Sequence, residues 1–413
     1  MNENVWSGAW VAERLGVRIV GEGLPGLVGM AVRRNPRRAH LLVSTVLGKH
    51  VPTDPRVVYG AGIRLGGLVR ARLDGDDAIV LGYAETATAL GHSVADALAG
   101  AYYLHSTRRP VPGFTPYGAF EEEHSHATSH LMLPADPAML DRDVPLVLVD
   151  DELSTGRTVL NTIEALHAVR PRGHYVVAAL VDLRGEADWA RMRELEARLG
   201  ARIETVALAA GRVELPDDIL DAGRALVDEL EQHGGQAVPG ESHPVMRADL
   251  MWPEDLPDGG RHGFLPEHRA RLEKELPAMA ERVADLVEGR RVLVLGFEEL
   301  MYAPLRLAEA LADALPDVDV RYSTTTRSPV LAVDEPGYAI RTRLVFPAHD
   351  DPADGPGDRY AYNVAGGGFD AIVLMVDDAG DTEALSGGLL ERLAQLAPVV
   401  LAAVPSYRGE PAP

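Results

Sequence analysis

Residues 144–160, VPLVLVDDELSTGRTVL, limit the possible folds of this chain more than any other stretch. The run from Val144 to Val149 is apolar on both faces apart from its proline, which predicts a buried strand of a parallel sheet. From Thr158 onward the apolar positions recur at helical spacing. Two adjacent carboxylates at the C-terminal end of a buried strand are costly unless they face a ligand. Open α/β sheets bind ligands at that edge, so we expect a ligand site here.

The chain has 413 residues, which is enough for two or three domains, and a hydrophobic content of 46% that is ordinary for a globular protein. It contains no cysteine, which excludes a disulfide framework, thiolate catalysis and cysteine-ligated zinc. The formal net charge of −22 argues against nonspecific binding to nucleic acid or to an acidic membrane. The start of the chain lacks a basic region, and no window reaches about 18 consecutive apolar residues. We therefore expect a cytoplasmic protein without a membrane span.

The first half of the chain alternates strand and helix patterns, which predicts a mostly parallel α/β sheet. We expect strands at 41–47, 78–82, 101–107, 146–150 and 176–182, and helices at 88–100, 158–170 and 217–232. A stretch rich in Gly and Pro follows and reads as a linker at about 234–260. We place the domains at 1–238 and 239–413.

The second half repeats the alternation and predicts a second, smaller α/β domain. A charged amphipathic helix is expected at 267–288, and further strands in RRVLVLG, VDVRYSTTTRSP, FDAIVLMVDD and PVVLAAVPSY. Glu298 and Glu299 are expected at a helix start, where acids complement the helix dipole. RHGF at 261–264 is either a further ligand contact or a structured linker.

The turn after residue 150 has the chemistry of a ribose 5-phosphate site. A helix N-terminus offers unpaired N–H groups and a positive dipole end to a phosphate. Ser154, Thr155 and Thr158 can add hydroxyl donors, and Gly156 allows the backbone to approach closely. The paired acids just upstream can accept hydrogen bonds from a diol.

This stretch resembles the 5-phosphoribosyl-1-diphosphate (PRPP) loop of type I, orotate-like phosphoribosyltransferases. AIVLGYAETATALGHSVADAL resembles their pyrophosphate loop and helix, LVSTVLGKHVP their N-terminal substrate segment and HSTRRP a strand end with basic residues. FEEEHSHATSHLML lies where those enzymes carry a mobile catalytic loop. STTTRSPV contains the Thr-Arg-Ser-Pro motif of the TRSP domain, found in two-domain relatives encoded with tellurite-resistance and stress-response genes.

The resemblance implies a pentosyltransferase that displaces pyrophosphate at C1 of Mg–PRPP and makes a nucleoside- or nucleotide-like metabolite. The implied catalytic residues are Asp150, Asp151, Lys49, Arg108, Arg109, His124 and His126. The implied PRPP-binding residues are Glu152, Leu153, Ser154, Thr155, Gly156, Arg157, Thr158, Glu85, Thr86, Ala87 and Thr88. Mg²⁺ would be held by Asp150 and Asp151. An anion site in the second domain would comprise Thr325, Thr326, Arg327 and Ser328, assisting acceptor recognition or a following step. The partners would be PRPP and a base-like acceptor, without nucleic acid or membrane, and a homodimer is compatible with the family.

Two departures from the family pattern leave alternatives open. Orotate-type enzymes usually carry a Lys in the pyrophosphate loop, where this chain has Glu85, and their mobile loop carries lysines rather than His124 and His126. A carboxylate would repel pyrophosphate unless a cation lies between them. One alternative is a regulator that senses PRPP without turnover, and another is a salvage enzyme for a common nucleobase. His124, His126 and His130 also form a metal-like spacing, although loop histidines are the simpler interpretation.

Overall fold

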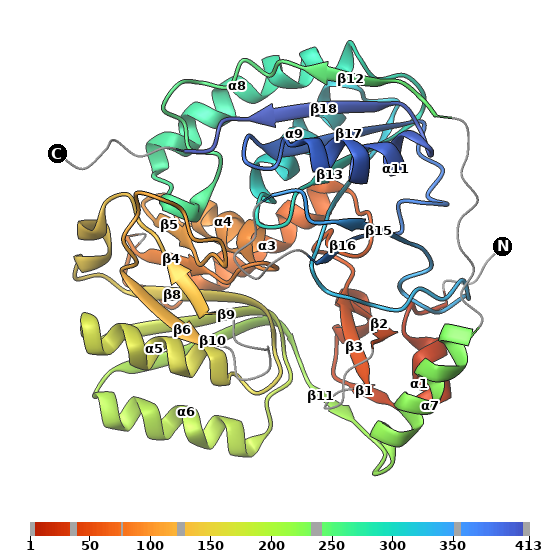
Figure 1. Ribbon diagram of the computed structural model, residues 1–413. Coiled ribbons are helices and arrows are strands. Elements are labelled where there is room, and N and C mark those ends of the chain that lie inside the picture. Colours follow the sequence, from red (N-terminus) through yellow and green to blue (C-terminus); the bar gives the residue numbers. More distant parts are fainter. Residues whose placement is uncertain are drawn as a thin grey trace.

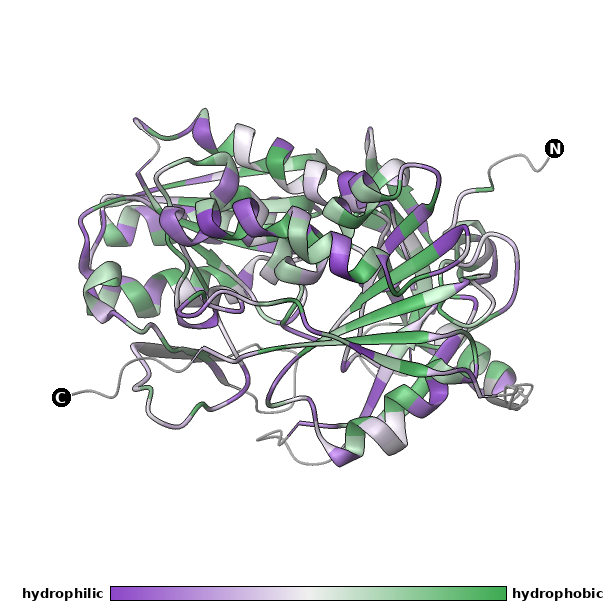
Figure 2. Ribbon diagram, turned by 90° about the horizontal axis from the view of Figure 1, so that it is seen from above, coloured by the Kyte–Doolittle hydropathy of each residue, from purple (hydrophilic) through white to green (hydrophobic). Residues whose placement is uncertain are grey.

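The computed structural model describes residues 5–33, 39–75, 77–121, 129–232, 242–350 and 357–407. Two five-stranded sheets dominate the described chain, and one lies above the other in Figure 1. Both consist of parallel strands flanked by helices, which confirms the predicted fold class. Figure 2 shows the reason: the strands are hydrophobic along most of their length, whereas the helices carry hydrophilic residues on one face.

The first sheet has the strand order β10-β9-β8-β4-β5. Its strands are β4 (Ile79–Gly82), β5 (Tyr102–His105), β8 (Leu146–Leu153), β9 (His174–Asp182) and β10 (Arg202–Ala210). Helices α3 (Pro55–Arg70) and α4 (Thr88–Ala97) contact it on one face, and the connections from β8 through β10 carry α5 (Arg157–Val169) and α6 (Glu186–Leu199). The sequence prediction missed α3, α6 and β10. Residues 118–121 and 129–132 form the antiparallel pair β6 (Gly118–Glu121) and β7 (Ser129–Met132), and a short helical turn, Pro137–Asp141, precedes β8.

A small subdomain lies beside the first sheet, at the lower right of Figure 1. It contains α1 (Ala9–Leu15), β1 (Arg18–Val20), α2 (Leu24–Leu27), β2 (Val28–Val32), β3 (His40–Ser44), β11 (Arg212–Glu214) and α7 (Ile219–Gln232). Strands β2 and β3 are antiparallel, as are β1 and β11. Val330, Tyr338 and Ile340 from the second half of the chain are buried in the core of this subdomain. The two halves of the sequence therefore interlock.

The second sheet has the order β12-β18-β17-β13-β14. Its strands are β12 (Val245–Ala248), β13 (Arg291–Gly296), β14 (Asp319–Thr324), β17 (Ala371–Asp377) and β18 (Val399–Val404). The helices are α8 (Pro266–Ala284), α9 (Tyr302–Ala314), the short α10 (Glu383–Leu385) and α11 (Glu391–Ala394) joined by one π-turn at Ser386–Leu390, and a 3-10 turn at Gly260–His262. Strands β15 (Arg343–Pro347) and β16 (Asp358–Tyr362) form a hairpin. Helix α9 contacts both α3 and α4, so it joins the two halves.

The strand register places several carboxyl ends at one level. In the first sheet Gly82 of β4 lies opposite His105 of β5 and Val149 of β8. In the second sheet Gly296 of β13 lies opposite Thr324 of β14. The loops that leave these strand ends contact one another, as the bonds of Thr107 and Arg108 to Glu299 show. The carboxyl ends of the two sheets therefore face each other.

Candidate active site

The predicted phosphate turn links β8 to α5. Strand β8 continues to Leu153, three residues beyond the predicted end, and the side chain of Leu153 is buried in the core. The backbone N–H of Asp151 donates to the Asp150 carboxylate at 2.9 Å. Gly156 adopts φ of 70° at the start of α5, a conformation that glycine tolerates without a steric penalty. The helix therefore begins at a tight turn whose N–H groups follow the acid pair.

An arginine packs against this turn from the neighbouring strand end. A Cβ at Gly156 would lie 2.9 Å from Cδ of Arg184. Both carboxylate oxygens of Asp182 accept from the Arg184 guanidinium, at 2.9 and 2.7 Å, and Thr205 Oγ1 accepts at 3.0 Å. Because Arg184 is fixed in this way, only glycine fits at position 156 without displacement.

The pyrophosphate loop meets the predicted lysine. Lys49 Nζ donates to Thr86 Oγ1 at 2.6 Å and lies 3.7 Å from Glu85 Oε1. The next two loop residues, Ala87 and Thr88, are buried against the sheet and begin α4. Burial, together with the nearby Lys49 and Arg33, lowers the pKa of His50 well below its usual value. The His50 imidazole is therefore neutral.

The second domain holds the segment that carries Lys49. Thr53 and Tyr322 of β14 exchange two backbone hydrogen bonds, at 3.0 and 2.8 Å. Ser323 Oγ donates to the carbonyl of Gly48 at 2.6 Å, and Asn363 Nδ2 donates to the carbonyl of His50 at 2.8 Å. Bonds on both sides of Lys49 thus come from the second half of the chain.

The Thr-Arg-Ser-Pro motif follows the end of β14 and lies against the pyrophosphate loop. Arg327 Nε donates to Glu298 at 2.5 Å and lies 3.9 Å from Glu85 Oε2, while the Arg327 backbone N–H lies 3.4 Å from the same oxygen. Ser328 N–H donates to Thr326 Oγ1 at 3.1 Å. Glu85 thus lies between Lys49 and Arg327, so the unexpected carboxylate is matched by cations from both sides.

One cavity of about 440 Å³ brings these segments together. It is lined by Arg33, Leu41, Leu42, Lys49, His50, Tyr83, Ala84, Glu85, Thr86, Arg108, Asp150, Asp151, Glu152, Ser154, Thr326, Arg327, Ser328 and Pro329. Three regions contribute: the carboxyl edge of the first sheet, the small subdomain with the segment after β3, and the strand end of the second domain. Its size suits a small-molecule ligand.

Family models match both halves of the chain. Residues 27–212 match a family described as phosphoribosyl transferase, and residues 258–393 match the TRSP domain that lies C-terminal to it. The chain belongs to the phosphoribosyltransferase family with a C-terminal TRSP domain. This confirms the resemblance to phosphoribosyltransferases with a TRSP domain, and it makes the protein a pentosyltransferase.

Several solved phosphoribosyltransferases also match the first domain. The adenine phosphoribosyltransferase of Rhodothermus marinus is 17% identical, with a TM-score of 0.32 over 45% of this chain and 96% of its own. The Trypanosoma brucei adenine enzyme, solved with AMP, pyrophosphate and ribose-5-phosphate, is 14% identical, with a TM-score of 0.31 over 44% and 76%. A Staphylococcus aureus hypoxanthine phosphoribosyltransferase is 11% identical, with a TM-score of 0.23 over 39% and 79%. The comparison with curated proteins gives no match.

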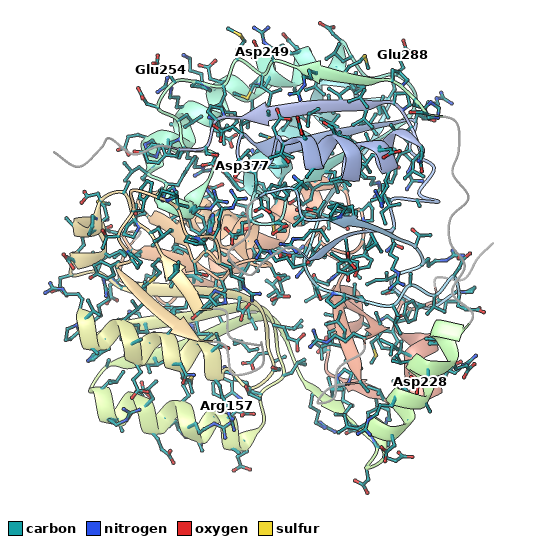
Figure 3. All side chains as sticks on the ribbon, viewed as in Figure 1. Arg157, Asp228, Asp249, Glu254, Glu288 and Asp377 are labelled. Carbon is teal, nitrogen blue, oxygen red and sulfur yellow. The ribbon has the colours of Figure 1, made fainter. Side chains whose placement is uncertain are left out.

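Several predicted site residues lie elsewhere. Arg109 does not line the cavity of this phosphoribosyltransferase; it pairs with Asp377 at 2.8 Å and Asp350 at 3.0 Å. Buried acids of the TRSP domain bind Arg109 instead, and its role at the pyrophosphate stays a prediction. Figure 3 labels Asp377 near the middle of the molecule, where the two domains meet. His124 and His126 fall outside the described residues.

Other predicted site residues do not place a side chain in the cavity; they form the backbone of the phosphate turn or pack in the core. Thr155, Gly156, Arg157 and Thr158 form the turn and the first residues of α5, and Thr325 is buried, where its Oγ1 accepts from the Glu298 N–H at 3.1 Å. His130 is buried, with Nδ1 2.8 Å from Ser106 Oγ. Within the described ranges no group of three or more metal-binding side chains occurs. The metal-like spacing of the histidines stays a prediction, because His124 and His126 lie outside those ranges.

Two acids of the TRSP domain, predicted to lie at a helix start, have a different role. Helix α9 starts at Tyr302, so Glu298 and Glu299 precede it rather than capping it. Glu298 accepts from Arg327 and Arg359, and Glu299 accepts from Thr107 and Arg108. RHGF at 261–264 is a structured linker: Phe264 and Tyr103 of β5 exchange hydrogen bonds of 2.7 and 2.9 Å. The only signal for the acids was their position after a buried strand.

Proposed function

We propose that the cavity binds Mg–PRPP and a base-like acceptor and that the enzyme makes a nucleoside- or nucleotide-like metabolite by displacing pyrophosphate at C1. The observation that carries this proposal is the single cavity shared by the acid pair, the pyrophosphate loop and the Thr-Arg-Ser-Pro motif. The 5-phosphate would bind the N–H groups of the turn at 154–158, where the dipole of α5 favours an anion. Asp150 and Asp151 would accept hydrogen bonds from the ribose hydroxyls.

The same two acids fit Mg²⁺. Both are half-buried carboxylates on the cavity wall, and Mg²⁺ is usually bound by one or two carboxylates together with substrate phosphates. A bound Mg²⁺ would neutralise charge on the pyrophosphate. Because two carboxylates and the substrate phosphates can hold Mg²⁺, this proposal needs no larger cluster of metal-binding side chains, and none occurs among the described residues.

The leaving pyrophosphate would face cations from three segments. Lys49, Arg108 and Arg327 all line the cavity; side-chain hydrogen bonds hold Lys49 and Arg327 before a ligand binds, and a bond from its backbone N–H holds Arg108. Fixed cations directed at a developing negative charge lower a barrier without reorganisation during the reaction. Lys49 and Arg327 also offset Glu85, which favours turnover over mere sensing of PRPP. His124 and His126 remain our candidates for acid–base catalysis.

The TRSP domain would assist acceptor recognition as a wall of this site. Thr326, Arg327, Ser328 and Pro329 line the same cavity as Ser154 of the phosphate turn, and Leu41 and Leu42 add an apolar surface suited to a ring. A separate following reaction is less well supported, because Arg109 and Arg261 occupy the carboxyl edge of the second sheet. No helix in the described ranges could cross a membrane. A cytoplasmic location and a homodimer stay part of the proposal.

Calorimetric titration of PRPP into the full chain, with and without Mg²⁺, tests the proposal. The Asp150→Asn/Asp151→Asn variant should bind at least about 100-fold more weakly, because charge-assisted hydrogen bonds each contribute about 1.5–3 kcal/mol. The matched control is Asp217→Asn/Asp218→Asn, another adjacent acid pair, which is exposed before α7. A folded wild-type protein that binds no PRPP would refute the proposal. Pyrophosphate release with a panel of nucleobases would then separate an enzyme from a sensor.

A further inference from the structure

The turn between β13 and α9 carries two adjacent buried carboxylates. Phe297 and Leu300 close it with reciprocal backbone hydrogen bonds of 3.3 and 2.8 Å. Glu298 sits at φ of 46°, in the left-handed region, which is sterically unfavourable for a non-glycine residue. Glu298 is 2% exposed and Glu299 is 7% exposed. A strained backbone that buries two acids side by side needs compensating contacts, and the contacts of both acids lead to the cavity.

Glu299 holds the end of β5. Its carboxylate accepts from Thr107 Oγ1 at 2.7 Å and from the backbone N–H of Arg108 at 3.0 Å, while Arg261 Nε lies 3.3 Å away. Burial opposes ionisation, but Arg261, His105 and the Arg108 N–H outweigh it and lower the pKa of Glu299. The carboxylate is therefore ionised and fixes the peptide from which the Arg108 side chain enters the cavity wall.

Glu298 holds the guanidinium of Arg327, which belongs to the same domain as Glu298. Arg327 Nε donates to one carboxylate oxygen and Arg359 Nε to the other, at 2.5 and 2.7 Å. Burial raises the pKa of Glu298 to about 7, with Arg327 and Arg359 opposing that rise. A long arginine side chain loses conformational entropy when it is held in one rotamer. Because Glu298 holds Arg327 already in the free protein, this entropy is not lost again when a ligand binds.

We propose that the Glu298–Glu299 turn of the TRSP domain is a positioning element that aligns Arg108 and Arg327, one from each domain, on the pyrophosphate side of the cavity. This inference rests on the proposed function. Neither acid would contact the substrate. Glu298 would act through Arg327, and Glu299 would act through Arg108. The second domain would therefore set the affinity for the leaving group as well as the shape of the acceptor wall.

Double-mutant cycles with inorganic pyrophosphate as the probe test this role by calorimetry on the full chain. In Glu299→Gln, the amide N–H₂ would oppose the N–H of either Arg108 or Arg261, and we expect binding about tenfold weaker. In an Arg108→Ala background the same change should have no further effect, since Glu299 acts through Arg108. Glu298→Gln should behave in the same way with Arg327→Ala.

Glu273→Gln is the matched control. Glu273 holds Arg306 with two bonds of 2.9 Å within the second domain, and neither residue lines the cavity. Its loss should leave pyrophosphate affinity unchanged. If Glu299→Gln does not fold, Thr107→Val removes one donor to the same carboxylate and should weaken binding several-fold. Unchanged affinity in folded Glu299→Gln or Thr107→Val, or fully additive cycles, would overturn the positioning role. Failure of the wild type to bind both PRPP and pyrophosphate would instead refute the proposed function, and this inference with it.

Discussion

The carboxyl ends of the two parallel sheets have the same architecture, but one end borders a cavity and the other is filled by side chains. At the first sheet, Asp150 and Asp151 are half-buried and line a cavity. At the second sheet, Asp377 is fully buried and pairs with Arg109 at 2.8 Å and Arg261 at 3.6 Å. One edge is open to a ligand, and the other is filled by arginines. An open α/β sheet offers a ligand crevice at this edge, but side chains of the protein itself can occupy it.

This difference suggests why the second domain exists in this chain. Its filled edge attaches it to β5 through Arg109, and its neighbouring strand end supplies Arg327 to the cavity of the first domain. A domain with its own open crevice would point to a second reaction. The filled crevice agrees with our proposal that this domain completes one site. Substitutions at the filled edge should therefore affect stability, whereas those at the open edge should affect ligand binding.

The largest expected effect is on stability, at the filled edge. Arg109→Met leaves Asp377 and Asp350 buried without their closest cation, and breaking a buried pair on one side costs about 3–5 kcal/mol. Urea unfolding of the full chain measures this loss. The control is Arg247→Met, which breaks an exposed pair with Asp381 and should cost about 1 kcal/mol or less. Equal losses in the two variants would contradict a filled, buried edge.

The next effect is on the reaction, at the open edge. Arg327→Met removes one preorganised cation from the cavity wall and should lower kcat/KM for PRPP about 10²-fold. Steady-state kinetics with any accepted base measures it, and calorimetry with pyrophosphate serves before a base is known. Arg341→Met breaks an exposed pair with Asp334 in the same domain and provides the comparison. If Arg327→Met lost stability but kept its affinity for pyrophosphate, Arg327 would have a structural role, like the arginines of the filled edge.

A smaller effect is expected at the phosphate turn. Gly156→Ala forces a side chain into φ of 70° and against Cδ of Arg184, which should cost about 1–3 kcal/mol and weaken PRPP binding. Gly200→Ala has a similar φ of 64° after α6, but no atom lies within 4 Å of the new Cβ. It should lose stability without losing affinity. Equal affinities for PRPP in the two variants would show that the turn does not hold the phosphate.

The smallest effect concerns pH. Burial lowers the pKa of His105 to about 4, with Arg261 adding to the shift and Glu299 opposing it. The unfolded chain titrates near the ordinary value, so this stability is present above about pH 6.5 and is lost as the pH falls toward 4. The free energy of unfolding should drop by about 1 kcal/mol between pH 6.5 and 5.5 because of His105. The drop should shrink by that amount in His105→Gln, and an unchanged drop would contradict the buried neutral imidazole.

The open edge was predictable from the sequence because its chemistry is local. Asp150 and Asp151 lie near the end of a strand made obvious by its aliphatic run, and Ser154 and Gly156 follow that strand directly. The Thr-Arg-Ser-Pro motif is equally compact. Lys49 was recognised because lysine is rare in this chain and because its segment resembles a substrate-binding one.

The filled edge was not predictable because its pairs span the whole chain. Arg109 and Asp377 are 268 residues apart, and Arg108 and Glu299 are 191 residues apart. A basic pair at a strand end, such as Arg108 and Arg109, looks like a single anion site in sequence. Adjacent residues leave a strand in different directions, so one arginine lines the cavity and the other meets buried acids. The same holds for Glu298 and Glu299, whose left-handed turn has no sequence signal without a glycine.

A crystal structure of the full chain with Mg²⁺ and PRPP tests the shared cavity most directly. We expect the 5-phosphate on the turn at residues 154–158, the ribose hydroxyls at Asp150 and Asp151, and pyrophosphate within reach of both Arg108 and Arg327. PRPP bound without any contact to the second domain, or bound outside this cavity, would contradict this expectation.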